Sequence, residues 1–233
     1  MTAFHMPSAR RRRLVLDRRT VLAVCRELSA ASDDNRLGNP SDPLSDLIYI
    51  VISNKTAPGM ASRTYANLTR QFNRWEDLLE APISAVRRVL RPAGLAGVKA
   101  RQLRGALRKI KRDLGELSLD ALRGWPERRQ LEYLTTLPGV SGKVARCVMM
   151  YTLNAHVLPV DAHVHRLARR LGWTSRKRAD QCHEELEAII PPASRFAFHV
   201  GAILVGRSIC RPRDPRCGEC RLRSYCPAAT KSA

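Results

Sequence analysis

Four cysteines lie close together near the end of the chain, and they constrain its fold more than any other feature of the sequence. They span 17 residues with the spacing C-x6-C-x2-C-x5-C, at Cys210, Cys217, Cys220 and Cys226. The chain has seven cysteines, and this odd number does not suit a closed disulfide framework. Zinc sites with four cysteines usually contain two close pairs, and iron–sulfur clusters also use four cysteines in compact runs. The spacing therefore predicts a metal centre and leaves zinc and iron both open.

Outside this segment the apolar residues recur with helical spacing, and clean alternating strands are absent. Asp42 followed by Pro43 is typical of the start of a helix, and Ser84 is expected to cap a short one. The other cysteines, Cys25, Cys147 and Cys182, fall on apolar helix faces and are expected in the core. An all-α protein with roughly nine or ten helices follows. Helical patterns cover residues 20–30, 44–52, 65–72, 86–90, 103–114, 144–153, 164–171, 186–190 and 196–204.

The chain is strongly basic, with 41 Lys and Arg against 21 Asp and Glu and a net charge of +20. Such a charge suits a polyanionic partner, nucleic acid first and an acidic membrane surface second. No apolar run approaches the ~20 residues that a membrane span needs. No uninterrupted apolar core follows Arg10–Arg13, so a secretory signal is not expected. We therefore expect a protein of the bacterial cytoplasm, associated with the nucleoid and making no membrane contact.

The segment Leu137–Ala145 predicts a tight turn between two helices, with Gly139 and Gly142 in the turn. Backbone N–H groups at the start of the second helix can bind an anion, here a DNA phosphate. An ordinary helix–helix turn is the alternative. Lys143 lies in the first turn of that helix, where the positive helix end should lower the pKa of an ammonium group. A neutral lysine can act as a nucleophile, whereas most lysines are simply solvated at the surface.

Asp161 precedes the apolar stripe that begins at Val164 and can cap a helix there. A carboxylate held beside an active site is the second interpretation, and the two are compatible because capping would orient the side chain. His163 and His165 lie two residues apart and do not share a helix face, which does not favour a shared metal ion.

These segments, in this order, resemble the helix-hairpin-helix DNA glycosylases of the endonuclease III type. The resemblance runs from about Ser41 to Cys226 and is carried by Leu137-Pro-Gly-Val-x-x-Lys143, Val160-Asp161-Ala-His163 and the four cysteines. It implies two helical domains flanking a DNA-binding cleft, and a 4Fe–4S cluster on the cysteines. A six-helix barrel with the helical hairpin would cover residues 46–155. Residues 20–45 and 156–233 would form the cluster domain, and residues 1–19 a basic, disordered tail that adds DNA affinity.

The resemblance also implies roles for particular residues. Lys143 would be the nucleophile, and Asp161 would activate it and stabilise positive charge on the sugar. Gly139, Val140 and Gly142 of the hairpin would bind DNA, Leu95 would insert into the duplex, and Lys55 stands where a glutamine often fills the space left by the flipped base. The implied protein is a monomeric base-excision repair glycosylase with AP lyase activity. It would remove damaged, oxidised pyrimidines from double-stranded DNA, act on abasic sites, and cut the strand by β-elimination.

The chain departs from the family pattern near that position. Besides Lys55, Pro58 replaces an expected acid, and Ser141 stands where a glycine is usual in the hairpin. The residues at Lys55 and Pro58 favour, as an alternative, a glycosylase of the same fold that acts on mismatched thymine or uracil. A noncatalytic iron–sulfur DNA-binding protein and a zinc-containing DNA-binding module are the remaining alternatives.

Overall fold

The computed structural model describes residues 17–32, 36–57 and 59–229, and all regular structure in these residues is helical. The all-α fold expected from the sequence is therefore confirmed. Six short 3-10 helices, η1–η6, connect or follow the α-helices. The α-helices are α1 (Arg18–Ser29), α2 (Pro43–Ser53), α3 (Met60–Gln71), α4 (Trp75–Glu80), α5 (Ile83–Leu90), α6 (Ala96–Leu114), α7 (Glu127–Thr135), α8 (Gly142–Thr152), α9 (Ala162–Arg170), α10 (His183–Ile189) and α11 (Arg195–Ser208).

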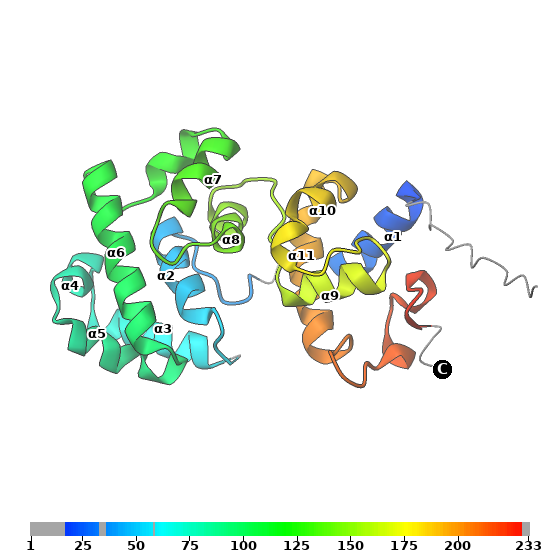
Figure 1. The fold of residues 1–233 in the computed structure, drawn as a ribbon, viewed down its shortest axis with the longest axis horizontal. Helices are drawn as coiled ribbons and strands as arrows, with labels where there is room; N and C mark the ends of the chain where they lie inside the picture. The colour runs from blue at the N-terminus through cyan, green and yellow to red at the C-terminus, as the bar shows by residue number, and fades with distance from the viewer. Residues whose placement is uncertain (1–16, 33–35, 58, 230–233) are drawn as a thin grey trace, which may run out of the picture.

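The helices form two lobes, each with its own buried core. Helices α2–α8 make the first lobe, on the left of Figure 1, and α9–α11 make the second together with the C-terminal segment. Helix α1 precedes the first lobe in the chain but packs in the second, against α11. The close approach of α1 to α11 depends on Gly201 of α11, because a Cβ atom there would lie 2.4 Å from the backbone oxygen of Leu28 in α1.

Helix α2 occupies the centre of the first lobe for reasons that its sequence already shows. Its start follows the expected pattern: the Asp42 side chain accepts a hydrogen bond from the N–H of Ser45 at 2.8 Å, and Pro43 is the first helical residue. Nearly every side chain of α2 is apolar, and all residues from Leu47 to Ile52 are buried. The helix can therefore pack against α3, α6 and α8 at once.

Several boundaries differ from the sequence-based expectations. Helix α5 starts at Ile83, after Pro82, so Ser84 lies inside the helix and is not its cap. Helix α1 begins at Arg18, within the segment expected to be a disordered tail, and residues 1–16 lie outside the described residues. Helix α2 begins three residues before position 46, the expected domain boundary.

Helix α4 of the first lobe has no counterpart among the expected segments, and α7 was expected only as the helix before the turn at Leu137, without bounds of its own. Helix α4 has six residues with one buried side chain, and α7 buries only Gln130 and Leu134. Helices this short or this polar carry too little apolar periodicity to be recognised. Within the described residues, no single helix is long and apolar enough to cross a membrane. One pair of helices, His183–Ile189 and Pro192–Ser208, has the length and apolar composition of a membrane span only when the two are counted together, and they are bent by 108° relative to each other.

Candidate active site

A cavity of about 660 Å³ lies where the two lobes meet. Its lining includes the end of α2 and the loop after it, the start of α8 from the first lobe, and the start of α9 and part of α11 from the second. Lys143 comes from α8 and Asp161 from the residue before α9, and both line this cavity. The structure therefore brings together, at the junction of the lobes, the two residues that the sequence singled out for chemistry.

Lys143 is half-buried in the first turn of α8. Burial alone lowers its pKa. The neighbouring Cys147 and the carboxyl groups of Asp161 and Asp46 outweigh burial, so the pKa of this lysine is raised above its ordinary value. The expectation of a lowered pKa is thus wrong for the protein without DNA. The positive end of a helix acts as a fraction of a unit charge, and Cys147 together with the two carboxyl groups outweighs it.

Asp161 both caps α9 and faces the cavity, as the sequence suggested was possible. Its Oδ1 accepts hydrogen bonds from the N–H groups of His163 and Val164, each at 2.8 Å. Burial raises the pKa of this carboxyl, but His199, the bond from Val164 and the charge of Lys143 together hold the pKa below its usual value. Asp161 is therefore a fixed carboxylate with a defined orientation beside Lys143.

The turn before α8 has the backbone geometry expected of the hairpin. Gly139 has φ +83°, and a Cβ atom there would lie 2.7 Å from the side chain of Gln102. Ser141 caps α8, its Oγ lying 3.4 Å from the N–H of Val144. No hydrogen bond within the described residues uses the N–H groups of Gly142 and Lys143, which are free to bind an anion.

Val140 differs from the other residues of this turn. Its side chain is buried, and its N–H donates to the carbonyl of Leu137 at 3.1 Å. Its contribution within the described structure is therefore to the core and to the shape of the turn.

Two further residues singled out from the sequence, Lys55 and Leu95, lie on exposed turns of the first lobe. Lys55 follows α2 and lines the cavity, whereas Leu95 precedes α6 and does not. Both have positive φ, 54° for Lys55 and 51° for Leu95, a region that residues other than glycine rarely adopt. Leu95 is 55% exposed, which is unusual for a leucine and places an apolar side chain in solvent.

The cavity also contains residues that the sequence did not mark as functional. Tyr49, Tyr151 and Cys147 line it while being almost fully buried. Cys147 was assigned to the core; it is buried, and it also lies next to Lys143, one helical turn away. The i, i+4 spacing of these two residues was the signal that could have indicated this contact.

His199 of α11 is the other such residue, and it has no local sequence signal. Its Nδ1 lies 2.9 Å from the carbonyl of Pro159, so Nδ1 carries the proton and donates. Burial lowers the pKa of His199 to about 4. This histidine is therefore neutral near pH 7 and lies beside the Asp161 carboxylate.

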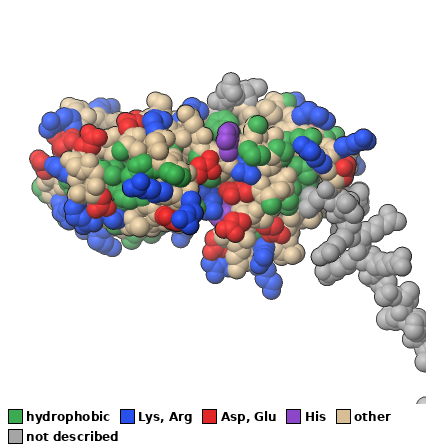
Figure 2. Space-filling view, turned by 90° about the horizontal axis from the view of Figure 1, so that it is seen from above, with side chains coloured by type: hydrophobic (Ala, Val, Ile, Leu, Met, Phe, Trp, Pro, Cys, Tyr) green, Lys and Arg blue, Asp and Glu red, His purple; other side chains and the backbone are tan. Residues whose placement is uncertain are grey.

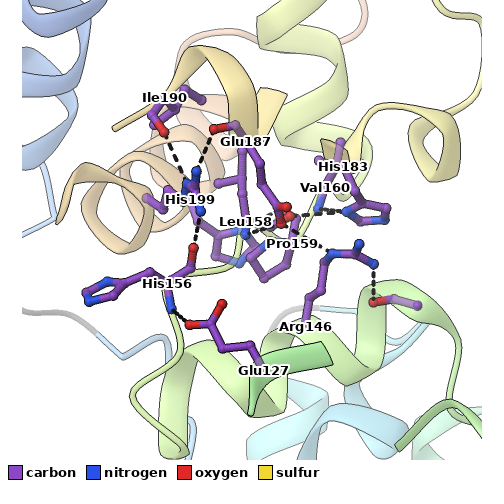
Figure 3. A network of polar contacts seen from close by, with 12 residues as sticks. Glu127, Arg146, His156, Leu158, Pro159, Val160, His183, Glu187, Ile190 and His199 are labelled. Atoms are coloured by element: carbon purple, nitrogen blue, oxygen red, sulfur yellow. Dashed lines mark hydrogen bonds and ion pairs between the residues drawn. The ribbon is translucent and has the colours of Figure 1, made fainter. Parts of the chain in front are cut away.

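The extended segment that leads from α8 to Asp161 is held by side chains of both lobes (Figure 3). Glu187 of α10 is central: its Oε1 accepts hydrogen bonds from the N–H of Leu158 at 2.8 Å and from the Arg146 guanidinium at 3.3 Å. Glu127 of α7 accepts a hydrogen bond from the N–H of His156 at 2.7 Å. Because this segment ends at Asp161, these bonds help fix Asp161 relative to Lys143 on α8.

The four cysteines of the C-terminal segment surround a second cavity, of about 80 Å³, in the second lobe. Cys210 is buried and the other three are half-buried, and all are free thiols. Arg170 of α9 joins this site to the lobe, because its guanidinium lies 3.0 Å from the Cys210 sulfur. No three His, Cys, Asp or Glu side chains among the described residues converge closely enough to hold a single metal ion. All four thiols line this one cavity, so a single group placed there could be held by all of them.

Lys and Arg side chains are spread over the surfaces of both lobes (Figure 2). They include several arginines in and around the cysteine segment, such as Arg213, Arg221 and Arg223, which are exposed. With a net charge of +20, the chain as a whole suits a polyanionic partner.

A family model for the HhH-GPD superfamily base excision DNA repair proteins matches residues 48–192. A candidate DNA glycosylase of Arabidopsis thaliana is 32% identical over 155 residues, which cover 66% of this chain and 53% of that protein. Endonuclease III of Thermotoga maritima is 27% identical over 186 residues, 80% of this chain and 83% of that protein. A solved structure of a trapped endonuclease III–DNA covalent intermediate superposes with a TM-score of 0.81 at 22% identity, covering 93% of this chain and 98% of that one. The two-lobed helical fold expected from the sequence is the fold of these proteins.

Proposed function

Because the chain belongs to the HhH-GPD superfamily of base excision DNA repair proteins, we propose that it is a DNA glycosylase that also has AP lyase activity. The observation that carries this proposal is the presence of Lys143 and Asp161 in one cavity at the junction of the lobes. A damaged base in a duplex must leave the stack to be reached by an enzyme, and the cavity of about 660 Å³ has room for it.

The proposed substrate is double-stranded DNA that contains a damaged, oxidised pyrimidine or an abasic site. The nitrogen of Lys143 attacks C1′ of the sugar while the bond between C1′ and the base breaks, and the base leaves with the bonding electrons. The Asp161 carboxylate stabilises the positive charge that develops on the sugar. Because the pKa of Lys143 is raised, its ammonium must lose a proton before attack. The Asp161 carboxylate beside it is the proposed acceptor. The departing pyrimidine anion is a stronger base and takes this proton from Asp161, which returns the carboxylate to its charged form.

The covalent intermediate then leads to strand cleavage. Opening of the sugar ring forms a Schiff base between C1′ and the Lys143 nitrogen. The Schiff base acidifies the C2′ proton, and its loss expels the phosphate from C3′. Strand cleavage therefore requires the same lysine that removes the base.

DNA contacts of the proposed enzyme come from the exposed turns of the first lobe. The free N–H groups of Gly142 and Lys143 would bind a phosphate at the start of α8, in the turn shaped by Gly139 and Val140. Leu95 would enter the duplex, and Lys55 at the cavity rim would occupy space left by the flipped base. We propose that a monomer suffices, because both lobes of one chain line the cavity.

We also propose that Cys210, Cys217, Cys220 and Cys226 hold a 4Fe–4S cluster. The supporting observation is that these thiols surround a cavity of about 80 Å³, and iron–sulfur clusters are held by four cysteine thiolates. When bound, the cluster would supply a rigid centre for the arginine-rich segment rather than redox chemistry on the substrate.

The test of the enzymatic proposal is covalent trapping. Purified protein is incubated with duplexes that contain a thymine glycol or an abasic site, and borohydride is added to reduce any Schiff base. A covalent complex on both duplexes is expected. It should disappear in Lys143→Ala and persist in Lys177→Ala, which removes an exposed lysine of the second lobe.

The outcomes separate the remaining alternatives. Trapping on abasic DNA alone keeps Lys143 as the nucleophile but contradicts thymine glycol as the substrate. Duplexes with guanine–thymine and guanine–uracil mismatches then test the second candidate function, which the exposed cation of Lys55 at the cavity rim favours. Trapping that persists in Lys143→Ala contradicts the assigned nucleophile, and no trapping on any duplex contradicts the lyase.

A further inference from the structure

A buried lysine connects the two exposed turns that carry Lys55 and Leu95. Lys99, in the first turn of α6, is only 3% exposed. Its ammonium donates to the carbonyl of Ile52 at 2.7 Å and to the carbonyl of Ala93 at 2.9 Å. The third hydrogen bond goes to the hydroxyl of Thr56 at 2.6 Å. An ammonium has three N–H donors, and here each has one acceptor.

The charge of Lys99 has no carboxylate partner. None of the ion pairs among the described residues includes this lysine. Burying an unpaired charge is unfavourable, and the dipoles of two carbonyls and a hydroxyl compensate it only in this arrangement. An apolar side chain here would remove a donor from the buried carbonyls of Ile52 and Ala93, so the lysine acts on the backbone of these two segments and does not merely fill space.

The three acceptors belong to two separate segments. Ile52 and Thr56 flank the turn that presents Lys55, at the end of α2. Ala93 lies in the short helix η1, two residues before Leu95. The Thr56 hydroxyl adds a direct link between the segments, since it lies 2.6 Å from the Ile52 carbonyl and 2.9 Å from the Ala93 carbonyl.

Both turns hold conformations that are unfavourable in isolation. Lys55 and Leu95 adopt positive φ, 54° and 51°, without being glycine, and this backbone region is sterically unfavourable for residues that carry a Cβ atom. Such conformations persist only where surrounding contacts over-determine them. The hydrogen bonds of Lys99 are contacts of this kind, because they reach the backbone of both turns from one buried atom.

We propose that Lys99 is a positioning residue that holds Lys55 and Leu95 at a fixed separation, so that the two side chains enter a DNA duplex as one rigid unit. This inference rests on the proposed function, in which the enzyme opens a duplex at the central cavity. Separating stacked bases in a duplex is unfavourable. A loosely held pair of turns would lose part of its binding energy in becoming ordered, and a rigid pair does not.

The test compares substrates that need duplex opening with one that does not. Lys99→Met keeps the approximate length and volume of the side chain but removes its three donors. Cleavage of an abasic site in a duplex should fall about tenfold or more, since small misplacements of positioning groups can have such effects. Cleavage of an abasic site in single-stranded DNA should stay within about twofold, because no stacked pair must be separated. Lys111→Met, an exposed lysine on the same helix, is the matched control.

A second variant and a second measurement keep the test decisive. Thr56→Val has nearly the same shape and removes only the hydroxyl. It should lower the ratio of the cleavage rate on duplex DNA to that on single-stranded DNA, but by less than Lys99→Met does. This variant replaces Lys99→Met in the test if that protein does not fold. Duplex opening is also followed directly, through the fluorescence of 2-aminopurine placed opposite the abasic site, which reports unstacking without strand cleavage.

The failure of this inference differs from the failure of the proposed function. If wild-type protein cleaves neither substrate, the lyase proposal fails, and the 2-aminopurine signal still shows whether Lys99→Met reduces duplex opening. The positioning role is overturned by a different result. In that result, Lys99→Met and Thr56→Val either lower the cleavage of both substrates equally or lower the cleavage of neither, and the 2-aminopurine signal stays unchanged.

Discussion

At the scale of single residues, Asp46 of α2 is the side chain whose environment departs most from its usual one. It is fully buried, and neither carboxyl oxygen accepts a hydrogen bond from the described residues. Burial raises the pKa of Asp46 to about 8, against the opposing charges of Arg36 and Lys143. The group is therefore protonated in the folded protein over a range of pH in which an unfolded chain would ionise it, so folding takes up a proton there.

The sign of the resulting pH dependence follows from linkage. Because the folded pKa is raised, the stabilisation is complete below the unfolded pKa of 3.8 and is lost as the pH rises toward about 8. Asp46→Asn stays neutral at every pH. We expect its free energy of unfolding to exceed that of the wild type at pH 8 by ~2 kcal/mol or more, with a smaller difference at pH 5, measured by urea unfolding. Asp120→Asn, at an exposed carboxyl, should show no such trend, and equal stability of Asp46→Asn and wild type at pH 8 would contradict a buried, protonated carboxyl.

At the scale of structural elements, the cysteine segment depends least on regular structure. Between Cys210 and Cys226 the chain forms only the three-residue helices η5 and η6, and only Leu222 of the intervening side chains is buried among apolar residues. A segment with so few internal contacts needs another source of order. The proposed 4Fe–4S cluster would provide four covalent attachments within 17 residues.

We therefore expect the purified protein to absorb near ~400 nm and to contain about four iron atoms per chain. Cys226→Ser should lose this absorbance and become sensitive to proteases at the exposed arginines of the segment. Cys25→Ser, at a buried thiol in the core of the same lobe, should retain both properties. Protein that contains one zinc and no visible absorbance would establish the zinc alternative instead.

At the scale of the whole molecule, the relative placement of the lobes determines whether Lys143 and Asp161 meet. They lie on different sides of the segment that crosses between the lobes, and Glu187 bonds both to that segment and to Arg146 of α8. The side chains of Arg146 and Glu187 are only 11% and 19% exposed. Removing one partner of a pair at this depth leaves a poorly solvated charge, which is strongly destabilising.

Glu187→Ala should lower the free energy of unfolding by ~2–3 kcal/mol, an effect below that of a fully buried pair because some solvent reaches this one. Borohydride trapping should also slow, since the segment that ends at Asp161 loses a contact. Glu132→Ala removes a pair whose side chains are 89% and 61% exposed and should change neither property. Unchanged trapping in a folded Glu187→Ala protein would show that the inter-lobe segment holds its position without Glu187.

Much of this structure could be predicted from short stretches of sequence. Three such features depend only on contacts within a few residues: the start of α2 at Asp42–Pro43, the cap of α9 by Asp161, and the position of Lys143 in the first turn of α8. Helix α4 was missed and the bounds of α7 were not given, because a short helix and a polar helix carry little periodicity. Ser84 was misplaced because the helix already begins at Ile83, after Pro82.

The sequence by itself determined the helical composition of the chain, the turn with Gly139 and the clustering of the four cysteines, because each of these depends on neighbouring residues. Only the tertiary structure decided the electrostatics of the cavity. The pKa of Lys143 is raised and not lowered because Cys147, one turn away on the same helix, and the carboxyl groups of Asp161 and Asp46, which other segments bring close, together outweigh burial. In the same way, two of the three acceptors of Lys99, on Ile52 and Thr56, lie 47 and 43 residues away along the chain. Charge interactions and buried hydrogen bonds depend on distance in space, and helical periodicity does not contain that information.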